Sequence, residues 1–95
     1  MHPFRIIVDA SRHAGTTSRH GGVRSRAVCV VIAEDLAAAV RTATTEILDM
    51  GLVPGPLLDA AAIDPTSAAD HEEQASIIEA LERGCSIVLH DPRPD

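Results

Sequence analysis

Arginine side chains crowd into one short stretch of this chain, where they could bind phosphate or carboxylate groups. The stretch of residues 12–26 reads RHAGTTSRHGGVRSR and contains no acidic residue. A guanidinium group can form two parallel hydrogen bonds with a phosphate or a carboxylate. Because three glycines lie between the arginines, we expect a flexible Arg/Gly-rich hairpin loop over these residues. The candidate anion-binding residues are Arg12, Arg19, Arg24 and Arg26.

Three features count against nucleic acid as the ligand of this loop. It has no aromatic side chain on which a base could stack. It also lacks the GK[ST] ending of a phosphate-binding loop and does not lead into a helix. Residues 1–26 carry a net charge of +4, but residues 27–95 carry −10 and would repel a polyanion. We therefore favour pairing of these arginines with the protein's own acids, then contact with a partner protein, over nucleotide or RNA binding.

Acidic side chains gather in the second half of the chain. Glu72, Glu79 and Glu82 fall near one side of a predicted helix, because spacings of seven and three keep residues aligned. Such a face is most often simply solvated, but it can also attract a basic partner. The candidate partner-binding residues are Asp70, Glu72, Glu73, Glu79 and Glu82.

The histidines and cysteines form no recognisable metal or catalytic motif. The five histidines never form an HxH or HExxH pair, and the two cysteines, Cys29 and Cys85, are far apart in sequence. Both cysteines lie in apolar, strand-like runs, so we expect reduced and buried thiols. The serines near histidines lie in the predicted loop, without the rigid scaffold that a catalytic triad needs. We predict no metal, no cofactor and no catalytic residue.

Length and composition indicate one small domain. The chain has 95 residues, a formal net charge of −6 and a single aromatic residue, Phe4. No apolar run approaches the roughly 18 residues of a membrane span, and the N-terminus lacks the apolar core of a secretory signal. We therefore expect a cytoplasmic protein that does not contact a membrane. All eight basic residues are arginine, which indicates the codon usage of a GC-rich bacterial genome.

Hydrophobic patterns predict six elements. Branched apolar residues predict the strands, and the run over 27–33 is apolar throughout, as in a central strand or one covered on both faces. The prolines and glycine of residues 52–56 predict a turn. The expected elements are strands over 4–10, 27–33, 57–63 and 86–90 and helices over 36–50 and 70–83.

Both helices carry cap residues and an expected buried stripe. Asp35 and Asp70 can cap the two starts, and Gly51 and Gly84 can close the two ends. The expected buried residues are Leu36, Val40, Ala43, Ile47 and Met50 in the first helix and Gln74, Ile77, Ile78 and Leu81 in the second.

The order ββαβαβ predicts an α+β fold: a two-layer sandwich in which a four-stranded sheet carries both helices on one face. Residues 1–95 form a single domain in this interpretation. We predict a small acidic, non-enzymatic binding protein, of the bacterial inhibitor or immunity type that covers a basic protein. Two alternatives remain open, a nucleotide- or RNA-binding module that uses the Arg loop and a small oligomeric enzyme or enzyme subunit. The sequence is also compatible with a homodimer.

Overall fold

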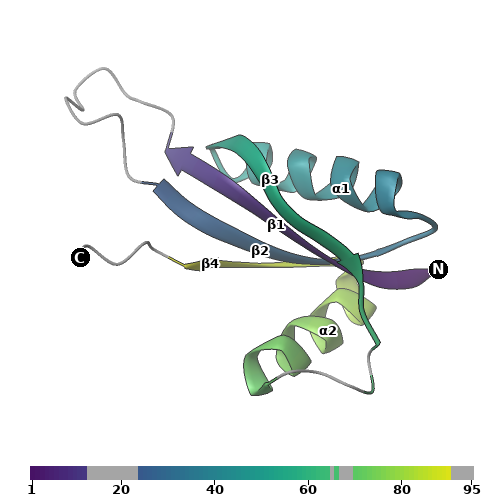
Figure 1. Cartoon of the computed structure of the whole chain (residues 1–95). Coiled ribbons are helices and arrows are strands. Elements are labelled where there is room, and N and C mark those ends of the chain that lie inside the picture. Colours follow the sequence, from purple (N-terminus) through teal and green to yellow (C-terminus); the bar gives the residue numbers. More distant parts are fainter. Residues whose placement is uncertain (13–23, 65, 67–69, 91–95) are drawn as a thin grey trace.

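The computed structural model describes residues 1–12, 24–64, 66 and 70–90, and its elements follow the predicted order. They are β1 (His2–Arg12), β2 (Arg24–Ala33), α1 (Leu36–Asp49), β3 (Leu52–Ala62), α2 (His71–Arg83) and β4 (Cys85–His90). The strands form one sheet in the order β3-β1-β2-β4, and every neighbouring pair is antiparallel (Figure 1). The α+β class, the four-stranded sheet and the order ββαβαβ are confirmed.

The hairpin of β1 and β2 forms the middle of the sheet. Its register pairs His2 with Ala33 at one end and Ser11 with Arg24 at the other. In β1, buried residues alternate with partly exposed ones, as expected when only one face of a strand is fully covered. The buried residues of β1 are Phe4, Ile6, Val8 and Ala10.

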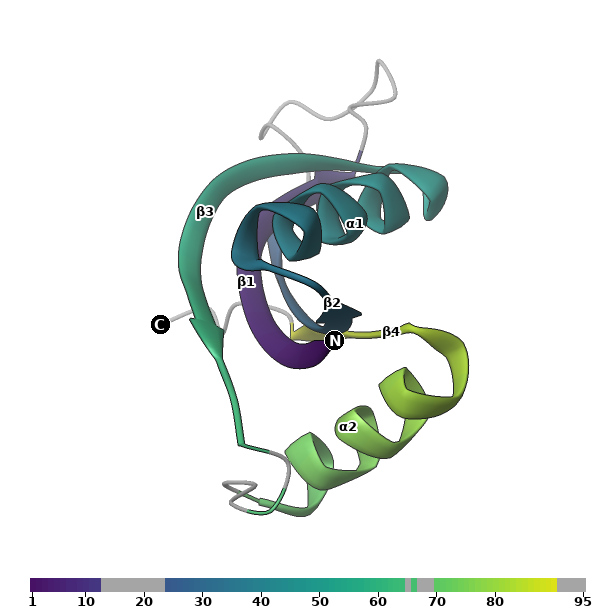
Figure 2. The ribbon, with the colours of Figure 1, turned by 90° about the vertical axis from the view of Figure 1, so that its right-hand side faces the viewer.

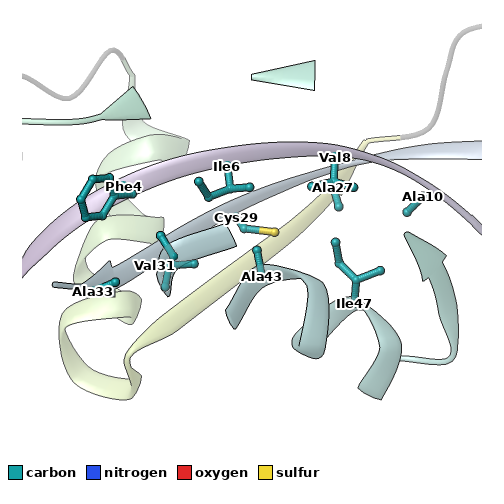
Figure 3. Close-up of a cluster of buried hydrophobic side chains, with 11 residues drawn as sticks. Phe4, Ile6, Val8, Ala10, Ala27, Cys29, Val31, Ala33, Ala43 and Ile47 are labelled. Carbon is teal, nitrogen blue, oxygen red and sulfur yellow. The ribbon is translucent and has the colours of Figure 1, made fainter. Parts of the chain in front are cut away.

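The larger core lies between the sheet and α1. Ala39, Ala43 and Ile47 are fully buried on one side of α1, where they face the buried residues of β1 and β2 (Figure 3). The expected stripe is confirmed at Ala43 and Ile47 in its middle, but Leu36 and Met50 at its ends are exposed. Small alanines let the helix approach the sheet closely, so an almost entirely aliphatic inventory can still fill this core.

The second helix packs on the opposite face of the sheet. Ile77 and Ala80 of α2 contact Val30, whereas the neighbouring β2 residues Cys29 and Val31 belong to the α1 core. Successive side chains of a strand point to opposite faces, so the two helices cover different faces. Figure 2 shows α1 and α2 on either side of the curved sheet. The prediction that both helices share one face, in two layers, is therefore wrong; the molecule has three layers.

The path of the chain explains this difference. The connection through α1 leads from β2 past β1 to β3, at one edge of the sheet. The connection through α2 then leads from β3 across the whole sheet to β4, at the other edge. Because β3 and β4 run in opposite directions, the handedness rule for parallel crossovers does not fix the face of α2. The run over 27–33 is apolar on both faces, and covering it on both sides requires one helix on each.

Strand β3 begins earlier than the sequence predicts. Residues 52–56, expected as a turn, belong to this strand, and Pro54 pairs with Ala10 of β1. An edge strand can include proline because one side of its backbone needs no partner. Its register shifts between Ile7 and Ala10 of β1. A Cβ at Gly55 would lie 2.9 Å from the carbonyl oxygen of Asp9, so glycine lets the two backbones approach closely here.

The predicted helix caps are present. Ala38 donates its backbone N–H to Asp35 over 2.8 Å, and Glu73 donates to Asp70 over 2.8 Å. Gly84 ends α2 with φ of 90°, a left-handed conformation that glycine adopts without steric cost. The caps fix where α2 starts and ends, and thus which of its side chains reach the sheet.

Candidate functional site

The acids at the start of α2 are engaged within the protein. Arg5 of β1 donates one hydrogen bond to Glu73 over 3.1 Å and one to Asp59 of β3 over 3.5 Å. The Glu73 side chain is only 13% exposed, so its carboxylate is partly withdrawn from solvent. Asp70 accepts the hydrogen bond that caps the helix. Two of the five predicted partner-binding residues, Glu73 and Asp70, thus hold α2 in place.

A third acid of α2 contacts the end of the sheet. His90 Nε2, at the end of β4, lies 2.8 Å from Glu72 Oε1, and both side chains are about half exposed. Together with the Arg5–Glu73 pair, this contact connects the first turn of α2 to both β1 and β4. The sequence shows Arg5 as a cation inside an apolar strand, but it does not reveal which acids would meet it.

The remaining two acids stay at the surface. Glu79 and Glu82 are exposed, and among the described residues neither forms an ion pair or a side-chain hydrogen bond. They lie in the second half of α2, away from the ion pairs of its first turn. Of the five predicted acids, these two are the ones that a partner could use without breaking a contact of the fold.

Two large apolar residues of α2 are exposed beside these acids. Ile78 is 53% exposed and Leu81 61%, and Gln74 is exposed as well. The prediction of a buried stripe at Gln74, Ile77, Ile78 and Leu81 is thus correct only for Ile77. The sequence contains apolar residues on two adjacent sides of this helix, and periodicity alone cannot tell which side meets the sheet. The contacts of Glu73 and Glu72 orient the helix so that Ile77 and Ala80 face inward.

A pocket of about 160 Å³ lies between the start of α2 and the sheet. Its lining combines apolar side chains of the sheet with the ion-paired groups just described. The lining residues are Arg5, Val28, Val30, Asp70, Glu72, Glu73, Ser76, Val88 and His90. Among the residues that the structure describes, the buried Arg5 Nε atom has no hydrogen-bond partner. Arg5 pairs with Glu73 and His90 with Glu72, while Asp70 caps the helix, so the charged groups of this pocket attach α2 to the sheet.

The predicted anion-binding loop lies mostly outside the described residues. The structure describes neither Arg19 nor the side chains of Arg12 and Arg24, although β1 and β2 extend to these two residues. Arg26 is exposed on β2, opposite Asp9 of β1 in the register. The prediction of an anion site in the loop therefore stays a prediction.

The two thiols are free and protonated at neutral pH. Burial raises the pKa of Cys29 to about 12, and the nearby Cys85 and Glu46 add to the shift. Burial likewise raises the pKa of Cys85 to about 11, with contributions from Glu46 and Glu79. A thiol needs a lowered pKa to act as a nucleophile, so neither side chain is set up for that role. Within the described residues, no three His, Cys, Asp or Glu side chains come together as a metal site.

Comparison of the chain with protein-family models, curated proteins and solved structures gives no match. Within the described part of the chain, no helix is long and apolar enough to cross a membrane.

Proposed function

We propose that this chain is a small binding protein that covers a basic partner protein, as an inhibitor or immunity protein does. The observation that carries the proposal is the charge of the described surface. The described side chains include twelve acids but only four arginines, and one of these, Arg5, is already shared by Glu73 and Asp59. A surface dominated by one charge raises the rate at which an oppositely charged partner associates.

The raised thiol pKa values also favour binding over cysteine-based catalysis. Cys29 and Cys85 lie within or beside the α1 core, where they pack like small apolar residues. The cluster around Arg5 pairs charged groups with one another across α2, β1 and β3, which is an arrangement that stabilises a fold. Exposed acids and apolar residues on α2, in contrast, are available to a second molecule.

The test is affinity capture at two ionic strengths from a lysate of the cells that make the protein. We expect one basic protein to remain bound at about 50 mM salt and to elute at about 500 mM, because salt screens attraction between exposed charges. The purified partner should then bind with a one-to-one stoichiometry, and saturation with the chain should block whatever activity the partner has. Failure to retain any protein at low salt, or retention that does not respond to salt, would overturn the proposal.

A charge-reversal variant tests whether electrostatic attraction drives binding of the partner. Reversal of the exposed acids Glu34, Asp49, Glu79 and Glu82 to lysine leaves the ion pairs of Arg5 and His90 intact. The association rate constant with the partner should fall by at least about tenfold at low salt and converge with that of the wild type at high salt. Nucleic acid on the captured wild-type chain, in place of protein, would support the alternative that the Arg loop binds RNA or a nucleotide.

A further inference from the structure

We infer that the partner docks on the outward side of the second half of α2, where Ile78 and Leu81 form an apolar centre beside Glu79 and Glu82. This inference rests on the proposed function and names the surface that performs it. The partner surface that fits is an apolar patch bordered by Lys or Arg side chains.

The fold buries only some of the apolar residues of α2. On the inner side of α2, Ile77 and Ala80 are almost fully buried against Val30. Ile78 and Leu81 remain more than half exposed although they are the bulkiest remaining apolar residues of this helix. They are three positions apart, so they lie next to each other on the helix surface. A large apolar pair that the core leaves exposed is well suited to be the anchor of an interface.

The acids of α2 divide in the same way, since the fold engages only those near the start of the helix. Asp70, Glu72 and Glu73 cap the helix or pair with His90 and Arg5, and all three lie in or before its first turn. Glu79 and Glu82 lie six and nine residues after Glu73, about two turns or more further along the helix, and have no such contact among the described residues. The division along the helix is therefore clear: its start attaches to the sheet, and its second half presents both unused charge and unused apolar surface.

The exposed apolar pair and the two surface acids lie on neighbouring sides of α2. Glu82 lies four positions after Ile78, one helical turn away on the same side, and Glu79 lies further round the helix. The apolar pair continues from the β1 side of α2, where Glu73 contacts Arg5, and Glu79 lies on the β4 side, where Glu72 contacts His90. The exposed side of α2 thus carries an apolar pair along one flank and acids along the other, and apolar contacts beside charged ones are usual in a protein interface.

The charge of these acids selects a basic partner and disfavours a second copy of the chain. Each copy has a formal net charge of −6, and two copies joined along α2 would bring Glu79 and Glu82 of both chains close together. Like charges across an interface oppose association. A partner with Lys or Arg around an apolar patch meets both parts of the surface with complementary chemistry.

A defined probe can map this surface without a cellular partner. We would titrate the basic amphipathic peptide LKKLLKLLKKLLKL into the ¹⁵N-labelled full chain and follow the amide shifts. The peptide LEELLELLEELLEL has the same apolar pattern with the opposite charge and serves as the control. We expect the largest shifts over residues 75–83 with the basic peptide and no saturable binding of the acidic one.

Two variants of α2 and two matched variants elsewhere test the assignment. Ile78→Ser/Leu81→Ser and Glu79→Lys/Glu82→Lys should each weaken binding of the basic peptide by about tenfold or more, as for interface anchors and their charged border. Two control variants replace residues of similar exposure or charge near α1. Leu48→Ser/Met50→Ser should change the affinity by less than about twofold. Glu34→Lys/Asp49→Lys makes the same change in net charge as Glu79→Lys/Glu82→Lys, and it should weaken binding clearly less than that pair because it acts only at long range. All four pairs lie at exposed positions, and circular dichroism checks that each variant is folded.

The outcomes separate the surface from the function. Shifts that centre on another part of the chain, or an equal loss in the α1 and α2 variants, would overturn the assignment to α2. If the peptide maps to α2 but the lysate experiment retains no protein at low salt, the surface is confirmed and the proposed function is wrong. If a basic protein is retained equally well by the wild type and both α2 variants, the proposed function stands and the inference is overturned.

Discussion

Arg5 is the cation that joins two acidic side chains on the α2 side of the sheet. It reaches from the middle of β1 to Glu73 of α2 and to Asp59 of β3. Its position follows from alternation, since it lies between Phe4 and Ile6, which point toward α1. The sequence therefore predicts that Arg5 points away from the main core. It does not predict the two acids, because they reach Arg5 only through the long-range placement of β3 and α2.

Replacement of Arg5 should loosen the attachment of α2. Arg5→Met keeps most of the apolar stem but leaves the partly buried Glu73 without this cation. We expect the free energy of unfolding to fall by about 1–2 kcal/mol, measured by urea denaturation. Glu73→Gln should cost less in the Arg5→Met background than in the wild type, which gives a coupling of about 0.5–1 kcal/mol. Equal costs in both backgrounds would show that the pair does not stabilise the fold.

The thiols make stability depend on pH in the alkaline range. The pKa of Cys29 rises from the ordinary 9.0 to about 12 on folding, and that of Cys85 to about 11. The folded chain thus keeps protons that the unfolded chain releases, so the free energy of unfolding should fall as the pH rises above about 9. The chain contains no lysine and no tyrosine, which would otherwise titrate there. Urea unfolding from about pH 8 to about pH 10.5 should show this fall for the wild type, and Cys29→Ala/Cys85→Ala should remove the slope; equal slopes would contradict the assignment.

The start of helix α2 is held by a cap and by ion pairs, whereas Ile78 and Leu81 in its second half are more than half exposed. Its cap, its first-turn acids and its closing Gly84 follow directly from short-range sequence signals, and the structure contains all three. Its rotation about its own axis does not follow from such signals. Both Ile77 and Ile78 are apolar, and the residue that faces inward is decided by Glu73 and Glu72, whose partners are more than sixty and nearly twenty positions away in sequence.

Asp70 offers a test at this scale, because it was predicted as a partner-binding acid and the structure shows it as a cap. Asp70→Ala should lower the free energy of unfolding by about 1 kcal/mol, whereas Asp70→Asn, whose side chain can still accept the hydrogen bond, should cost only a few tenths. Thermal or urea unfolding measures both. If the two variants lose the same stability, the charge of Asp70 matters more than its hydrogen bond to Glu73.

The whole molecule consists of a sheet with two cores of unequal size. Within the described part of the chain, eleven buried residues form the cluster on the α1 face, whereas Val30, Ile77 and Ala80 form the buried cluster on the α2 face. The number, type and order of the elements were predictable because they depend on local patterns. The face on which α2 packs was not, although the doubly apolar run over 27–33 indicated that both faces of β2 needed cover.

This imbalance predicts that the two helices open with different free energies. In hydrogen–deuterium exchange under native conditions, backbone amides of α2 should exchange through a partial opening that leaves α1 and the β1–β2 hairpin protected. Ile77→Ala should speed exchange in α2 with little effect on α1, whereas Ile47→Ala should destabilise the whole domain by about 2–5 kcal/mol. Equal protection of both helices would show that the molecule opens as a single cooperative unit.

The edge strand β3 affects whether the sheets of two neighbouring molecules can join. An exposed sheet edge offers unpaired N–H and C=O groups on which another chain can assemble. Pro54 and Pro56 of β3 have no backbone N–H to donate to an added strand, and the shifts in register between Ile7 and Ala10 of β1 make the strand irregular at the same place. The same prolines that make residues 52–56 resemble a turn in the sequence therefore disfavour the addition of another chain's strand at this edge of the sheet.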